Sequence, residues 1–489
     1  MSDSMILTNA DYLAYKQCPK SLWIRKHQKE VLPETFGKTS LSGSTKEELL
    51  RNLFPSGKWM VSTDIKKKAE ETAAAIESGE TVLLKAAFAY EDKVAIVDAA
   101  VKHNDGWHLF NVTTSTHVKE RHIDECTYAS AVAQEVIPVY SLLVVAINSD
   151  YVRGQSLSFR DLVTVHDVTE QIAEKQRLFI RDAEDINDVV LASSYECSIG
   201  THCSSYGKEK AECPAKQHCW ADIPSYSVFN VARIGSKAYD LYQDGVVNFE
   251  DIPDEVKLTA NQRAQVDMYK NKTVHIDTKS IQEFLSDFTY PLYFLDFETY
   301  QSVIPLYEHT SPYQQLPFQY SLHIQSTPDH SAQHKEFLAK EGTDARRLLA
   351  ERLIHDIPRD VNVVAYNMSF EKRVLRELAD LFPDLATHLL SIHDNMLDIM
   401  VPFQKKWYQS YRMKGKYSIK YVLPALFPDD PELNYQTLDI QNGSMAMDVF
   451  AQLHTYPPER IKELREALLA YCKLDTYAMV KIFKKLQSL

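Results

Sequence analysis

The sequence lacks the features that would place the chain across a membrane. No apolar run reaches the roughly 20 residues of a membrane-spanning helix, and the N-terminal residues MSDSMILT do not form a signal-peptide pattern. We therefore expect a cytoplasmic protein without a membrane partner. The 489 residues are 45% hydrophobic and 25% charged, which suits roughly three globular domains, each with its own core.

Basic residues are too few to make the whole surface positive. Lys and Arg total 54 against 67 for Asp and Glu, so the formal net charge is −13. A surface of that charge does not attract polyanions as a whole. Any contact with nucleic acid must therefore use a local basic patch.

Cysteines are also few, with seven in the chain, which excludes the dense disulfide framework of a small secreted domain. Four of them nevertheless lie in one short segment, as Cys197, Cys203, Cys213 and Cys219. In a reducing compartment, such crowding favours metal or cluster ligation. No Cys-x2-Cys pair of zinc-ribbon type is present, so the spacing leaves an iron–sulfur cluster and tetrahedral zinc open, with His202 and His218 as weaker candidates.

The N-terminal part predicts a small α/β core. A helical pattern begins with Thr8 or Asn9 as its N-cap and is interrupted near Pro19, where Cys18 lies. Alone, Cys18 is more typical of a small core residue than of a ligand. The pattern then predicts, in chain order, paired strands over 81–89 and 93–101 with Asp98 in the second, a strand over 107–113, a helix over 123–136 and a strand over 139–147.

Several of these features resemble the RecB-type PD-(D/E)XK nucleases that carry an iron–sulfur cluster. The resemblance rests on three of them, Tyr12-x5-Cys18-Pro-Lys, the strands that carry Asp98 and Trp107, and the late cysteines. In that family a Glu-x-Lys on the third strand completes a metal site with an upstream Asp, which Asp98 matches. This chain has Asn111 and Thr113 in place of the Glu and Lys, so both charges are missing. The resemblance therefore implies a degenerate domain that keeps the fold and has lost nuclease activity.

The same resemblance implies a set of cluster ligands. In the related nucleases, one early cysteine joins three late ones and clamps the ends of the domain together. Carried over, the ligands of a 4Fe–4S cluster are Cys18, Cys203, Cys213 and Cys219, with Cys197 as the alternative fourth ligand and Zn²⁺ as the alternative metal. Because such a cluster closes a long loop, we expect its role to be structural.

The pattern over 225–285 predicts two or three helices with polar breaks, and we expect a connector without chemistry there. The next stretch, Leu292–Thr299, predicts a strand on which Asp296 and Glu298 share one face. Two such carboxylates can hold a hard divalent cation, which makes phosphate chemistry the first hypothesis. An isolated Asp-x-Glu is more often a solvated strand end, so the hypothesis depends on further acidic residues.

The remaining pattern has the order of a ribonuclease-H-like fold. It predicts strands over 318–324 and 334–338, a helix over 344–357, a strand over 361–367 and a helix over 369–381. Glu371 stands at the start of the last of these, just past a strand end, where ligands gather in α/β sheets. In the final helix, Tyr471 and Asp475 are four residues apart and share a face.

These acids resemble the motifs of the DnaQ-like (DEDD) 3′–5′ exonucleases, and Tyr-x3-Asp marks the tyrosine subgroup. The second motif usually carries Asp where this chain has Glu371, whose longer arm reaches a metal or its water from slightly farther back. The resemblance implies that Tyr471 orients the attacking water, and that Glu371 acts on one ion or on its water shell. Asp398 is a secondary candidate that is otherwise a helix cap. Two Mg²⁺ or Mn²⁺ ions, roughly 3.5–4 Å apart, would be held by Asp296, Glu298 and Asp475.

The whole chain resembles a bacterial fusion family, known mainly as a domain of unknown function, that joins a RecB-like half to this exonuclease-like half. The resemblance covers most of the chain and is carried by LDFETY, YNMSFEKRVL, SIKYVLPALF and YCKLDT. It predicts a degenerate RecB-like domain over 1–222, a helical connector over 223–287 and a DnaQ-like exonuclease domain over 288–489.

The stretch from Trp407 to Tyr421 mixes aromatic rings with cations in an otherwise acidic chain. Cations that neutralise phosphates and rings on which unpaired bases stack are what a single-strand groove uses. A solvated basic loop whose tyrosines pack on the core is the alternative. The candidate nucleic-acid contacts are Asn367, Arg412, Lys414, Lys416, Tyr417 and Lys420.

The sequence thus predicts a metal-dependent exonuclease that acts from the 3′ end of single-stranded DNA or RNA. A non-catalytic nucleic-acid-binding or scaffold protein is the alternative. No reader of the 2′-hydroxyl is recognisable, so DNA and RNA both stay open.

Overall fold

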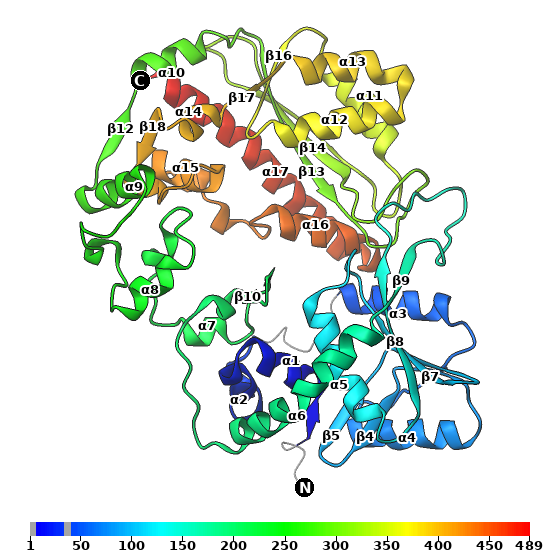
Figure 1. Cartoon of the computed structure of the whole chain (residues 1–489). Coiled ribbons are helices and arrows are strands. Elements are labelled where there is room, and N and C mark those ends of the chain that lie inside the picture. The colour runs from blue at the N-terminus through cyan, green and yellow to red at the C-terminus, as the bar shows by residue number, and fades with distance from the viewer. Residues whose placement is uncertain (1–5, 34–40) are drawn as a thin grey trace. The chain divides into compact units, whose positions relative to one another are not determined.

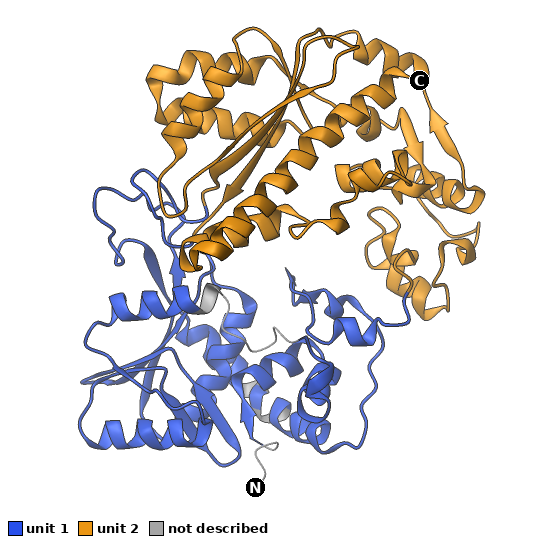
Figure 2. Cartoon of the chain, turned by 180° about the vertical axis from the view of Figure 1, so that it is seen from behind, with its two compact units in different colours: residues 1–223, 303–313 blue, residues 224–302, 314–489 orange. Residues whose placement is uncertain are grey.

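The computed structural model describes residues 6–33 and 41–489 (Figure 1). It is a mixed α/β protein, 46% helical and 18% strand, with several mixed sheets. The chain forms two compact units, one of residues 1–223 and 303–313, the other of residues 224–302 and 314–489 (Figure 2). Within the described ranges, no helix combines the length and the hydrophobicity needed to cross a membrane.

The expected connector is part of the second unit. Its strand β12 (Val274–Ile276), which the pattern did not predict, pairs antiparallel with β18 (Tyr408–Ser410). Helix α9 (Ala260–Asn271) contacts the short turn Tyr411–Met413. Because backbone hydrogen bonds join this segment to a much later one, it packs as part of the second unit and not as a free linker. Its other helices are α8 (Lys237–Gln243) and α10 (Thr278–Leu285).

A six-stranded mixed sheet is the framework of the first unit. Its order is β2 (Lys58–Trp59), β3 (Val82–Leu84), β6 (Ala99–His103), β7 (Gly106–Val112), β8 (Val139–Ile147) and β9 (Val163–Asp167). A smaller sheet has the order β1 (Leu7–Thr8), β5 (Lys93–Ile96) and β4 (Ala87–Tyr90). A two-stranded ribbon, β10 (Ser205–Tyr206) with β11 (Glu209–Lys210), lies in the cysteine-rich segment.

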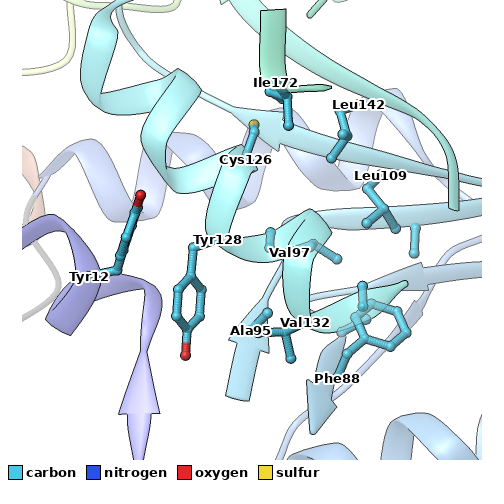
Figure 3. Close-up of a cluster of buried hydrophobic side chains, with 14 of the residues drawn as sticks. Tyr12, Phe88, Ala95, Val97, Leu109, Cys126, Tyr128, Val132, Leu142 and Ile172 are labelled. Atoms are coloured by element: carbon cyan, nitrogen blue, oxygen red, sulfur yellow. The ribbon is translucent and has the colours of Figure 1, made fainter. Parts of the chain in front are cut away.

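Helices cover these sheets and close the first core. Figure 3 shows Tyr12 beside Tyr128, and Val132, Leu109 and Phe88 in the same buried cluster. The helices are α1 (Asn9–Gln17), α2 (Pro19–His27), α3 (Leu41–Leu53), α4 (Ile65–Glu77), α5 (Glu120–Ala133), α6 (Thr169–Leu191) and α7 (Lys216–Cys219). A capping box between Thr8 and Asp11 begins α1, and Cys18 separates α1 from α2 as the sequence predicts.

The two strands expected over 81–89 and 93–101 are each broken in two, which corrects the prediction. Their outer parts, β3 and β6, pair in the large sheet, whereas β4 and β5 pair in the small one. Lys85 lies at the first break with a positive φ of 55°, and Asp98 lies at the second. The backbone N–H of Lys85 donates to the Asp98 carbonyl at 2.8 Å, so the two breaks face each other. Asp98 therefore lies between strands and not within one.

A five-stranded mixed sheet organises the second unit. Its order is β15 (Gln333–Leu338), β14 (Leu316–Gln325), β13 (Leu292–Tyr300), β16 (Asn362–Ala365) and β17 (Met396–Asp398). Strand β13 is central, antiparallel to β14 and parallel to β16, and β17 continues the parallel side. A central strand is covered on both faces, which explains why LYFLDFETY is buried at every position but Asp296, which is half-buried.

Helices pack on both faces of this sheet (Figure 1). The long helix α17 (Pro458–Gln487) crosses one face over β13 and β14. The other face shares a core with α11 (Arg346–Asp356), α12 (Ser369–Leu381) and α13 (Pro383–Asp394). The shorter helices are α14 (Val401–Gln404), α15 (Ile419–Leu426) and α16 (Gly443–Gln452).

Candidate active site

Strand β13 presents Asp296 and Glu298 on the face of the sheet that α17 covers. Leu295 belongs to the core shared with α11–α13. Phe294 packs against Phe483 of α17, with ring centroids 5.9 Å apart. Because successive side chains of a strand point to opposite faces, Asp296 and Glu298 lie on the α17 side together with Phe294.

Helix α17 brings three buried side chains to the same place, Tyr471, Cys472 and Asp475. The Cys472 Sγ lies 3.6 Å from Asp296 Oδ2 and 3.9 Å from the Asp296 carbonyl oxygen. The phenol of Tyr435 donates a 2.6 Å hydrogen bond to Asp475 Oδ1. Spacings of three and four residues place these α17 side chains on one helical face, which is why they converge on β13.

Glu371 approaches the same cluster from the first turn of α12. Its side chain is 2% exposed, and its Oε2 has no hydrogen-bond partner among the described residues. Asp398, at the end of β17, accepts hydrogen bonds from the backbone N–H groups of Asn367 (2.9 Å), Met368 (3.3 Å) and Met400 (2.9 Å). Asp398 thus fixes the loop that leads into α12, and neither α12 nor α14 has a side-chain cap at its N-terminus.

The four carboxyl groups repel one another in a buried setting. Burial raises the pKa of Asp296 well above its ordinary value, and the charges of Asp475, Glu298 and Glu371 raise it further. Burial likewise raises the pKa of Glu298 to about 8 and that of Glu371 to about 8. Burial raises the pKa of Asp475 to about 6, against the lowering effects of the Tyr435 hydrogen bond and the Lys420 charge.

This donor set fits a divalent cation. Among the described residues, Lys420 is the cation that lowers the pKa values of Glu298 and Asp475, and a single positive charge cannot balance four carboxylates. The unpartnered Oε2 of Glu371 leaves a buried acceptor to be satisfied. Mg²⁺ and Mn²⁺ take oxygen ligands and would relieve both the repulsion and the missing contact. The side chains that could hold such an ion are Asp296, Glu298 and Asp475, with Glu371 beside them.

The basic segment lies next to the loop that carries Asn367. The carbonyl of Tyr417 accepts a 2.5 Å hydrogen bond from the phenol of Tyr366. Lys416 donates to the Tyr421 phenol at 2.7 Å, and Lys420 lies in the first turn of α15. The exposed members of the predicted contact set are Asn367, Arg412, Lys416, Tyr417 and Lys420, whereas Lys414 is half-buried.

In the predicted degenerate site of the first unit, two lysines neutralise the charge of Asp98. The carboxylate of Asp98 forms ion pairs with Lys46 (2.6 Å) and Lys85 (2.9 Å), and it accepts a 2.8 Å hydrogen bond from the backbone N–H of Val112. These charges lower the pKa of Asp98 against the raising effect of its burial. Of the other two expected positions, Asn111 is buried and Thr113 lies 3.1 Å from His122 Nε2. The buried charge of Asp98 therefore has its counter-charges within the chain.

The structure brings Cys18 to the cysteine-rich segment. The Sγ atoms of Cys18 and Cys197 and a ring nitrogen of His202 lie within 4.8 Å of one another, and Cys197 Sγ is 3.7 Å from His202 Nε2. Burial raises the pKa of Cys18 to about 12, and the nearby Cys197 and Cys213 thiols raise it further. The N-terminal helices and the late segment thus meet at these side chains.

The other late cysteines lie close by. The backbone N–H of Cys213 donates to the Cys203 carbonyl at 3.1 Å. Burial raises the pKa of Cys219, and the charges of Cys213, Cys203 and Cys197 contribute. Among the described residues, the compact group with Cys18 contains Cys197, which was the alternative fourth ligand in the sequence analysis, and His202, which was a weaker candidate there. This soft donor set suits an iron–sulfur cluster or zinc.

Two residues of the acidic site were not predicted from the sequence. Cys472 stands three residues before Asp475 and therefore on the same helical face, so helical periodicity could have indicated it. Tyr435 lies 40 residues from Asp475 in a short turn, and no local pattern connects the two.

A family model described as a domain of unknown function (DUF2779) matches residues 293–418. The match begins in β13 and covers Asp296, Glu298, Glu371 and the basic segment up to Ser418, and it ends before α17. Searches of curated proteins and of solved structures gave no match.

Proposed function

We propose that this protein is a metal-dependent 3′–5′ exonuclease that hydrolyses phosphodiester bonds of single-stranded DNA or RNA. The observation that carries the proposal is the group of four carboxyl groups from β13, α12 and α17, three of them buried and Asp296 half-buried, whose pKa values are all raised and of which the Glu371 Oε2 has no hydrogen-bond partner among the described residues. Divalent ions bound there would activate water and stabilise the leaving 3′ oxygen. Perturbed carboxyl groups in such a cluster are typical of functional sites.

The topology of the second unit supports a ribonuclease-H-like, DnaQ-like assignment. The order β15-β14-β13-β16-β17, with β14 antiparallel to the central strand and β16 and β17 parallel to it, is the order that such a fold requires. Two acids on the central strand and one on the helix across it follow the arrangement of the resembled exonucleases. We infer that this unit carries the chemistry.

The protein side chains have separate roles in this proposal. Burial and the Asp475 charge raise the pKa of Tyr471, so its phenol stays protonated. Tyr471 therefore orients the attacking water through a hydrogen bond and does not act as a base. Tyr435 donates a hydrogen bond to Asp475 Oδ1, and Tyr471 also hydrogen-bonds the Asp475 carboxyl group, so the two phenols position this ligand. The basic segment and Asn367 bind the phosphates and bases of the incoming strand.

The first unit is proposed to be a degenerate RecB-like domain. The two lysines that pair with Asp98 neutralise the negative charge that a metal ion would otherwise balance. A 4Fe–4S cluster on Cys18 and the late cysteines, with Zn²⁺ as the alternative, would fasten the N-terminal helices to residues 197–219. Neither group takes part in hydrolysis.

The proposal is tested with 5′-end-labelled oligonucleotides. Single- and double-stranded DNA and RNA are incubated with Mg²⁺ or Mn²⁺, and a ladder that shortens from the 3′ end is expected for a single-stranded substrate. Asp296→Asn should abolish shortening, whereas Asp380→Asn, on the exposed side of α12, should not. Metal-independent binding without shortening on any substrate would instead support the non-catalytic alternative.

A further inference from the structure

We propose that Cys472 is a metal ligand and that it gives the acidic site a second, softer specificity, for divalent ions of the zinc class. This inference rests on the proposed function in one respect only, the position of the ion. The ligand atoms of Asp296, Glu298 and Cys472 all lie within 4.8 Å of one another. The unpartnered, almost fully buried Glu371 Oε2 in the same cluster independently indicates a missing positive partner.

The separation of sulfur and oxygen already suits a shared ion. Zinc binds thiolate sulfur at about 2.3 Å and carboxylate oxygen at about 2.1 Å, so two such ligands on a tetrahedral ion are roughly 3.6 Å apart. The Cys472 Sγ and Asp296 Oδ2 are 3.6 Å apart. Glu298 reaches the same point from two residues along β13, and Asp475 lies one helical turn from Cys472. The ligand atoms of Asp296, Glu298 and Cys472 are therefore close enough to share one ion.

The Cys472 thiol lies against one of the proposed ligands. Cys472 is fully buried, and among the described residues its Sγ contacts the carboxylate and the carbonyl oxygen of Asp296. With a hard ion such as Mg²⁺ in place, the S–H remains a weak donor to Asp296, because Mg²⁺ takes oxygen ligands. With a zinc-class ion, the sulfur–metal bond forms, a water leaves the ion, and the thiol proton passes to solvent.

This chemistry makes the site discriminate between ions. A thiolate adds affinity for soft ions and none for Mg²⁺. A zinc-class ion held by Asp296, Glu298 and Cys472 would occupy the position that the proposed reaction needs for Mg²⁺ or Mn²⁺. Zinc would then be expected to inhibit hydrolysis by displacing the activating ions.

The test measures metal binding directly. Zn²⁺ and Mn²⁺ affinities are determined by competition with a chromophoric chelator for the full chain and for Cys472→Ser, Cys472→Ala and Cys126→Ala. Removing a residue that only hydrogen-bonds a metal ligand lowers the metal affinity about 10–100-fold. Removing the ligand itself should cost at least as much, so both Cys472 variants should lower the Zn²⁺-to-Mn²⁺ affinity ratio at least about tenfold. Cys126 is an equally buried thiol of the first unit and serves as the matched control.

A second measurement keeps the inference testable if these variants fold poorly. Cd²⁺ titrated into the intact chain gives thiolate-to-cadmium absorption, and Asp296→Asn, which keeps every cysteine, should remove one thiolate's share of it. An unchanged affinity ratio in both Cys472 variants, or unchanged absorption in Asp296→Asn, overturns the inference. If the ratio changes but no substrate is shortened, the inference stands and the proposed nuclease function fails.

Discussion

Replacing Glu371 by Gln should stabilise the metal-free protein at neutral pH. The pKa of Glu371 is raised from its ordinary 4.5 to about 8 in the folded chain, chiefly by burial. Between these two values the folded state keeps a proton that the unfolded state loses, so stability falls by about 1.4 kcal/mol per pH unit. The stability that this group gives the fold is complete below pH 4.5 and is lost as the pH rises towards 8.

At pH 7 the loss amounts to roughly 3 kcal/mol, from two and a half units at about 1.4 kcal/mol each. Gln is neutral in both states and removes this loss, while burying an amide that lacks full pairing costs about 1–3 kcal/mol. The net gain of up to about 2 kcal/mol corresponds to a rise of up to roughly 8 °C in the melting temperature of the second unit. At pH 4.5 the gain disappears and the amide cost remains.

The assay is differential scanning calorimetry of wild type and Glu371→Gln in chelator at pH 5 and 7, then with MnCl₂. Mn²⁺ should stabilise the wild type by about 2.7 kcal/mol at a hundred times its dissociation constant, and should stabilise the variant less, so the order of the two melting temperatures reverses. Glu377→Gln, on the half-exposed side of the same helix, is the control and should show neither effect. Equal destabilisation by Glu371→Gln at both pH values, or equal stabilisation of both proteins by Mn²⁺, would refute the reasoning.

Three further outcomes are expected. The double variant Lys414→Ala, Lys416→Ala should weaken binding of single-stranded DNA, measured by fluorescence anisotropy. Each lost phosphate contact lowers the slope of log affinity against log salt concentration by about 0.7, so the slope should fall by about 1.4; an unchanged slope excludes these lysines as contacts. Tyr435→Phe removes a hydrogen bond that lowers the pKa of Asp475, so Mn²⁺ affinity by calorimetric titration should fall more at pH 6.5 than at pH 8, and a uniform loss would contradict this. Asp98→Asn should lower the free energy of unfolding of the first unit by about 3–5 kcal/mol in denaturant titration and leave hydrolysis intact; loss of hydrolysis would place chemistry in the first unit.

The regular elements of the second unit could be predicted because their patterns are long and unambiguous. The strand bounds at β13, β14 and β15 and the helix α12 agree with the sequence pattern to within two residues. The short strand β12 could not be predicted, since three exposed residues carry no periodicity and owe their pairing to a segment more than 130 residues later. The broken strands around Lys85 and Asp98 were missed because alternation continues through both breaks.

The candidate site could be predicted only as separate pieces. Spacing placed Asp296 with Glu298 on one strand face, and Tyr471 with Asp475 on one helix face, but it could not bring the two faces together. The resemblance to the exonucleases supplied that step. Helical periodicity indicates that Cys472 shares a face with Asp475, whereas the contact of Tyr435 with Asp475 joins segments 40 residues apart, and no local pattern encodes it.

The two buried carboxylate sites of this chain differ in where their positive charge comes from. Asp98 has Lys46 and Lys85 within 3 Å, so its burial is balanced when the chain folds. Among the described residues, Glu371 and its neighbours form no such ion pair and have only the charge of Lys420 nearby; burial raises their pKa values, so the folded metal-free site keeps protons at neutral pH that the unfolded chain loses. Charge removal should therefore have opposite signs at the two places, destabilising for Asp98→Asn and stabilising for Glu371→Gln without metal. Destabilisation by both variants in chelator at pH 7 would mean that the second site also has its counter-charge within the chain. The inference that this site requires an external cation would then be wrong.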